Sequence, residues 1–196
     1  MVAATSTSAK SRIVEAAVRL VARGGIAEAS LRKVADESGI NIGSVRYHFG
    51  TAEGLLVATA EEIGARMSRR LDSALPEPVV DRYATGPRGL VEDVCRAVLP
   101  VSESDRPELI VLVELIHAAR LRPEFRTLST RMGDDLRAVL RRVLEAVRVP
   151  DATMEAERLN ALVGGLTFEL VYPHGSHDPD TLFVVLRRHI AGIVPA

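Results

Sequence analysis

Apolar residues recur with the period of an α-helix along almost the whole chain. Ile13, Ala16, Leu20 and their neighbours share one helical face, and Gly24-Gly25 then ends the run. The same criteria predict helices over about 10–23, 31–38, 42–48, 51–74, 86–99, 106–121, 123–147 and 153–172, and a last one from Pro179. No alternating strand pattern and no internal repeat interrupts this series, so we expect an all-α fold of about nine helices.

The predicted helix ends carry residues suited to capping. Ser30 and Asn41 stand where an N-cap is required, and Asp178 precedes Pro179 in the same way at the last helix. Gly39 stops the second helix, and prolines fall between the later periodic segments.

Charge divides the chain into a basic head and an acidic body. The first 50 residues hold seven basic and four acidic side chains, a net charge of +3, whereas the 196-residue chain as a whole is −1. The predicted helix from residue 51 is about 36 Å long, enough to join two domains. We therefore expect a head domain over 1–52 and a helical body over 53–196.

The second and third predicted helices, with the turn at Gly39, have the spacing of a helix-turn-helix. Val34, Ile40, Val45 and Phe49 fall on the inner side of this unit. The positions left to face outward are Ile42, Gly43, Ser44, Arg46, Tyr47 and His48.

The outward residues suit contact with a DNA major groove. A glycine at position 43 allows the backbone to approach the duplex, and Ser44 can bond to a base edge or a phosphate. Arg46 can donate two hydrogen bonds to the edge of a guanine, while Tyr47 and His48 can donate to phosphate oxygens. A plain helical hairpin with no ligand is the alternative.

The segment over residues 11–63 resembles the N-terminal domain of the tetracycline-repressor (TetR) family of bacterial transcriptional regulators. The resemblance lies in the order of an amphipathic helix, the Gly-Gly stop, "SLRKVA", "SGI", "GSVRYHF" and "EGLL". The body is also similar in layout to betaine-regulator-like C-terminal domains. The resemblance implies an all-helical homodimer that binds a double-stranded DNA operator and is released by a small-molecule effector, most often as a repressor.

The resemblance also implies which residues contact DNA. Gly43, Ser44, Tyr47 and His48 match contact positions of the reading helix, and Ser30, Arg32 and Lys33 begin the helix that touches the DNA backbone. The family often has lysines where this chain has Ile42 and Ala52. We therefore expect affinity to depend on Arg32, Lys33, Arg46 and an arm around Lys10 and Arg12, with a shallow salt dependence.

Two helices of the body are apolar nearly all round. In the helix over 153–172, Ala161, Gly164 and Gly165 leave room for another helix to approach closely. We predict a dimer seam through the last two helices, formed by Ala161, Gly164, Gly165, Phe168, Phe183 and Leu186. The alternative is that the glycines accommodate a neighbouring helix of the same chain.

Polar residues on the otherwise apolar helix over 106–121 are candidates for effector binding. Glu114, His117 and Arg120 stand out there, either lining a pocket or forming a buried pair or a solvent-facing group. The chain has no tryptophan, three tyrosines and four phenylalanines, which argues against an aromatic cage for a choline-like ligand.

Several classes of function are not supported by the composition. We predict no metal site at His174 and His177, no cofactor, and no enzyme activity, because no phosphate loop, nucleophile elbow or catalytic carboxylate pair occurs. The single cysteine, Cys95, is expected to be a small buried hydrophobe in a cytoplasmic protein. A helical protein-interaction adaptor without DNA binding remains the alternative function.

Overall fold

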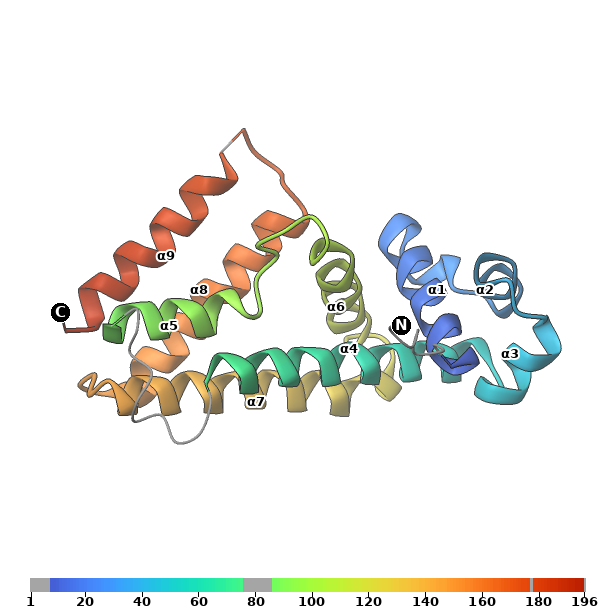
Figure 1. Ribbon diagram of the computed structural model, residues 1–196, viewed down its shortest axis with the longest axis horizontal. Coiled ribbons are helices and arrows are strands. Elements are labelled where there is room, and N and C mark those ends of the chain that lie inside the picture. Colours follow the sequence, from blue (N-terminus) through green and yellow to red (C-terminus); the bar gives the residue numbers. More distant parts are fainter. Residues whose placement is uncertain (1–7, 76–85, 177, 196) are drawn as a thin grey trace, which may run out of the picture. The chain divides into compact units, whose positions relative to one another are not determined.

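The computed structural model describes residues 8–75, 86–176 and 178–195, and in these ranges the chain is helical with no strand (Figure 1). The α-helices are α1 (Ala9–Gly24), α2 (Leu31–Ser38), α3 (Ile42–Phe49), α4 (Ala52–Ala74), α5 (Gly86–Arg96), α6 (Arg106–Ala118), α7 (Arg126–Ala146), α8 (Ala152–Val171) and α9 (Pro179–Ile193). Short 3₁₀ turns, η1 (Ile26–Glu28) and η3 (Pro123–Phe125), lie between them. The all-α prediction is confirmed.

The predicted caps form as hydrogen bonds. The hydroxyl of Ser30 accepts from the backbone N–H of Lys33, and the side chain of Asp178 accepts from the N–H of Asp180. Gly39 ends α2 in the left-handed conformation, at φ 67° and ψ 24°, where a glycine carries no Cβ penalty.

Two body helices end earlier than predicted. The helix α5 stops at Arg96 and α6 at Ala118. The guanidinium of Arg126 donates from Nε to the carbonyl oxygen of Ala119 at 3.2 Å, and so satisfies a carbonyl at the end of α6 that a longer helix would have used internally.

The chain forms two compact units, one of residues 1–64 with 110–129 and the other of 65–109 with 130–196. In the first unit, α1 to α3 and the start of α4 share a core with residues of α6 and of the segment that follows it. The fully or almost fully buried members include Ile13, Ala17, Val34, Val45, Leu55, Ile63, Val111 and Phe125. The boundary predicted at residue 52 separates the expected DNA-binding head from the expected effector-binding body, and it stays a prediction.

The second unit has its own core of α7, α8 and α9 side chains, among them Leu140, Leu144, Leu159, Leu186 and Ile190. Cys95 of α5 is buried as expected, and burial, with nearby Glu92 adding to it, raises the pKa of its thiol to about 12. None of the described helices combines the length and the apolarity needed to span a bilayer.

Candidate nucleic-acid interface

The helices α2 and α3 meet at a core that leaves one side of α3 uncovered. Val34 and Val45 are fully buried between the helices, and Ile40 and Phe49 pack at the edge of the same core. The side chain of Asn41 accepts from the N–H of Ser44 at 2.8 Å and fixes where α3 begins. The predicted helix-turn-helix geometry is therefore present.

A contact from α1 holds the turn of this unit. Arg12 donates from Nη2 to the carbonyl oxygen of Ser38 at 2.9 Å. The Ser38 hydroxyl donates to the carbonyl of Ala35 at 3.2 Å and accepts from the N–H of Ile40 at 3.3 Å. Arg12 was expected in an arm that contacts DNA, and Ser38 was not expected to have a role. Arg12 instead belongs to α1 and binds the end of α2.

The predicted outward face of α3 is exposed. Tyr47 is 86% exposed and Ile42 45% exposed, and Gly43, Arg46 and His48 are exposed as well. The rings of Tyr47 and His48 meet edge to face, with centroids 5.4 Å apart. Ser44 is half-buried, and its backbone N–H donates to the Asn41 side chain that caps α3. These side chains form one polar and aromatic surface that nothing in its own unit covers.

Gly43 has a local reason to be glycine. A Cβ at this position would lie 3.2 Å from Oδ1 of Asn41, the oxygen that caps α3. The absence of a side chain therefore relieves the cap and also leaves the backbone at the start of α3 open to approach.

The basic residues of α2 and α3 differ in how they are engaged. Lys33 donates from Nζ to both carboxylate oxygens of Glu28 at 2.8 Å, so its charge is partly neutralised. Arg32 and Arg46 are exposed and form no ion pair with any residue that the structure describes. Among the described residues of α2 and α3, Arg32 and Arg46 are therefore the exposed cations that no ion pair engages.

Two arginines of α1 bind a carboxylate of α2 and hold the two helices together. Glu37 receives hydrogen bonds from Arg19, at 2.7 Å from Nε, and from Nη2 of Arg23. The Arg19 hydrogen bond, with the Arg23 bond next, lowers the pKa of the Glu37 carboxyl. Arg19 and Arg23 are therefore engaged within the head, between α1 and α2.

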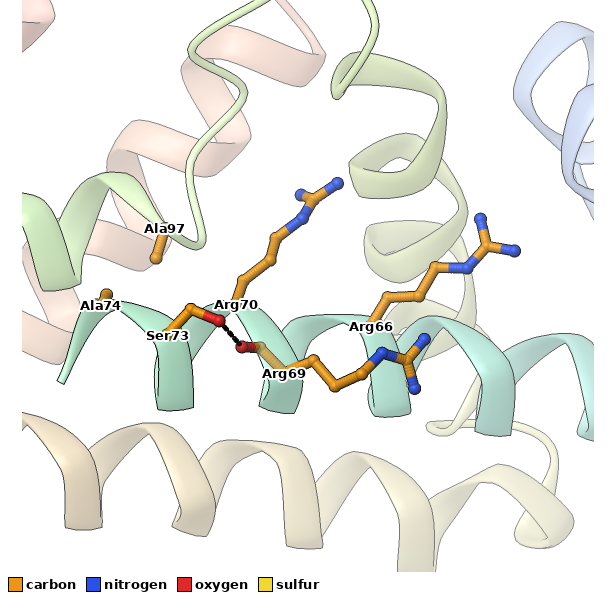
Figure 2. Close-up of a pocket in the computed structure, with 6 residues that line it drawn as sticks. All are labelled: Arg66, Arg69, Arg70, Ser73, Ala74 and Ala97. Carbon is orange, nitrogen blue, oxygen red and sulfur yellow. Dashed lines mark hydrogen bonds between the residues drawn. The ribbon is translucent and has the colours of Figure 1, made fainter. Parts of the chain in front are cut away.

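Among the described residues, the candidate effector residues Glu114, His117 and Arg120 are not part of the cavity that α4 lines. Glu114 is half-buried, and its Oε2 lies 3.6 Å from the place a Cβ on Gly25 would occupy. His117 and Arg120 are both exposed. That open cavity is lined by three arginines of α4, Arg66, Arg69 and Arg70, which were not predicted as site residues (Figure 2). Their occurrence within five residues of an amphipathic helix could have indicated a site.

The predicted seam residues fall into two groups. On α8, Ala161, Gly164 and Gly165 are exposed and Phe168 is 49% exposed, and a Cβ on either glycine would meet nothing within 4 Å. On α9, Leu186 is completely buried within the chain and has no surface to offer a partner.

Phe183 is the other α9 member, and it is half-buried with the guanidinium carbon of Arg96 4.6 Å from its ring centroid. Val184 and Val185 are the apolar side chains that α9 does expose, at 39% and 43%. The choice of Leu186 was wrong because the apolar stripe of α9 that it belongs to faces the core of its own unit.

Two family models match the chain. The model described as "Bacterial regulatory proteins, tetR family" matches residues 13–59, which contain α2 and α3. The model described as "BetI-type transcriptional repressor, C-terminal" matches residues 87–195, more than half of the chain.

Whole-length relatives carry related names. The chain is 23% identical over 188 residues to the HTH-type transcriptional regulator PksA of Bacillus subtilis, covering 94% of this chain and 89% of PksA. A solved transcriptional regulator from Rhodococcus sp. Rha1 has a TM-score of 0.82 at 24% identity, covering 95% of this chain and 96% of that one. The multidrug binding protein EbrR, solved with imidazole, has a TM-score of 0.64 at 29% identity, covering 96% and 97%.

Proposed function

The chain belongs to the TetR family of bacterial regulatory proteins, and from this premise we propose that it is a cytoplasmic repressor that binds an operator as a homodimer and leaves it when a small molecule binds. It is a transcriptional regulator rather than an enzyme.

The observation that carries the DNA proposal is the uncovered face of α3. A reading helix meets base edges with its N-terminal residues and phosphates with the residues around them. The exposed positions of α3, together with Arg32 at the start of α2, have this distribution of chemistry. We assign Ile42, Gly43 and Arg46 to the groove, and Arg32, Tyr47 and His48 to phosphate, with Ser30, Lys33 and Ser44 at the edges of the contact.

The proposed homodimer rests on the exposed small and apolar residues of α8. Gly164 and Gly165 lie over open space, with Ala161 one turn before them and Phe168 one turn after. Such a strip allows the same helix of a second copy to approach closely, as a two-fold interface requires. Two heads related by this symmetry would read half-sites about 34 Å apart on the duplex, which is one helical turn.

The test is a mobility-shift titration with DNA from the region flanking the gene, at several salt concentrations. We expect Arg46→Ala and Tyr47→Ala each to weaken binding about tenfold, since each removes contacts worth roughly 1–3 kcal/mol. Arg131→Ala is the matched control, because Arg131 is an exposed arginine of α7. If both α3 variants bound as tightly as the parent chain, α3 would not be the reading helix.

A further inference from the structure

Ile42, the first residue of α3, places a large apolar side chain on the exposed surface of that helix. It is 45% exposed, whereas Val45, three residues later, is fully buried. The neighbours of Ile42 in the chain offer it no apolar cover, because Asn41 is exposed and caps α3 through its side-chain oxygen, and Gly43 has no side chain. The helix therefore begins with an isoleucine whose apolar surface faces water.

The residues around Ile42 favour a polyanion over an apolar protein surface as the partner. Arg46 follows one turn later and shares a face of α3 with Ile42. Arg46 and Arg32 are exposed and form no ion pair with any described residue. Among the described residues of α2 and α3, only Ile42 and Tyr47 are large exposed hydrophobic side chains, which is too few for an apolar patch.

The major groove of DNA presents an apolar group on one base, the C5-methyl group of thymine. The other groups that distinguish the bases there are hydrogen-bond donors and acceptors, and an isoleucine placed over one of them would remove it from water without pairing it. Against thymine, both the methyl group and the isoleucine side chain lose apolar area to water, which is favourable. An isoleucine in the groove therefore selects thymine.

We propose that Ile42 is a specificity-determining residue that contacts the methyl group of one thymine in each half-site of the operator. This inference rests on the proposed function, because it requires α3 to lie in a major groove. The N-terminal residues of a reading helix meet base edges, and Ile42 is the first of them. Arg46 lies about 6 Å further along the helix axis. At about 3.4 Å per base pair, it meets a base within two steps of that thymine.

The experiment replaces thymine with uracil, which lacks only the C5-methyl group. Footprinting of DNA from the region flanking the gene first locates the two half-sites bound by the full chain. Duplexes with uracil at one thymine position, changed symmetrically in both half-sites, are then titrated in mobility shifts. We expect one position where uracil lowers the affinity of the parent chain about fifteenfold, because each buried methyl group is worth about fourfold and the half-sites multiply.

Variants identify the side chain that meets the methyl group. At the sensitive position we expect uracil to lower the affinity of Ile42→Ala less than about twofold, because the apolar partner of the methyl group has been truncated. Ile42→Val should keep part of the effect. Ile116→Ala is the matched control, since Ile116 is 47% exposed on α6, and it should respond to uracil as the parent chain does.

A second base substitution separates the methyl group from the rest of thymine. Cytosine at the sensitive position removes the methyl group and changes the hydrogen-bonding edge, whereas 5-methylcytosine differs from cytosine by the methyl group alone. We expect the parent chain to bind the 5-methylcytosine duplex about fifteenfold more tightly than the cytosine duplex. Ile42→Ala should bind the two alike.

Three results would overturn the inference: a parent chain that binds every uracil duplex as tightly as its thymine counterpart, an Ile42→Ala variant with the same losses as the parent, or equal binding of cytosine and 5-methylcytosine by the parent. Any of these in a chain that still shifts its operator would leave the proposed DNA function standing, because base contacts by Arg46 do not depend on Ile42. A parent chain that shifts no flanking DNA would contradict the proposed function, and the role of Ile42 with it.

Discussion

Arg12 of α1 donates from Nη2 to the carbonyl oxygen of Ser38, the last residue of α2, at 2.9 Å. A cation at the carboxyl end of a helix also meets the negative end of its dipole. The contact ties the first helix of the head to the turn that orients α3, so Arg12 supports the fold of the helix-turn-helix.

Replacing Arg12 should therefore act on stability. We expect Arg12→Ala to lower the free energy of unfolding by about 1 kcal/mol, the usual worth of one such hydrogen bond. Arg32→Ala, at an exposed arginine without an ion pair to any described residue, should change stability by less than about 0.5 kcal/mol but weaken DNA binding. Urea titration of the full chain measures the first effect. Equal stability of the two variants would show that the Ser38 contact contributes nothing.

The ion pair between Glu28 and Lys33 predicts the salt dependence of DNA binding. Glu28→Gln removes the carboxylate that holds Lys33 Nζ, and we expect the released lysine to meet a phosphate. The slope of log K against log salt should then steepen by about 0.9 per half-site, with tighter binding at low salt. Asp36→Asn, which removes an exposed negative charge elsewhere on α2, is the control for charge alone. An identical slope in both variants would mean that Lys33 stays away from DNA.

Contacts between residues close in the sequence could be predicted, whereas contacts between distant residues could not. The caps of Ser30 and Asn41 were predictable because donor and acceptor are three residues apart, and the burial of Val34 and Val45 followed from periodicity. The bond from Arg12 spans 26 residues, and that from Arg66 to Glu108 spans 42. No local pattern selects such partners. The cavity beside α4 and the role of Arg12 could therefore be identified only from the three-dimensional structure.

Gly54 is required where α3 passes into α4. A Cβ at this position would lie 2.4 Å from the carbonyl oxygen of Phe49, a backbone atom that cannot turn aside. We expect Gly54→Ala to destabilise the chain by roughly 1–3 kcal/mol, the cost of overpacking. Gly192→Ala, on α9 with nothing within 4 Å of its new methyl group, should instead stabilise by up to about 1 kcal/mol. Thermal unfolding separates the two. A Gly54→Ala variant as stable as the parent would mean that the backbone at the junction of α3 and α4 shifts to accommodate the methyl group.

The buried thiol of Cys95 should be inert in the folded chain. With its pKa raised to about 12, only about one molecule in 10⁴ carries the thiolate at pH 8, and the thiolate is the reactive form. We expect a disulfide reagent to label Cys95 only as fast as the second unit opens, and urea above the midpoint to make labelling immediate. An added Ser104→Cys in the exposed loop before α6 reports ordinary reactivity. Rapid labelling of both cysteines in native buffer would contradict the burial of Cys95.

Gly164 gives a direct test of the proposed dimer. Arginine at this position enters open space in the single chain, so folding should be unaffected, but two copies of the added charge would meet across a two-fold seam. We expect Gly164→Arg to sediment as a monomer at micromolar concentration with an unchanged far-ultraviolet spectrum, and to bind its operator much more weakly, because each head then binds alone. Glu103→Arg adds positive charge at an exposed position of the loop before α6 and should remain dimeric. A dimer that persists in Gly164→Arg would place the interface on another surface, and the exposed Val184 and Val185 of α9 would be the next residues to change.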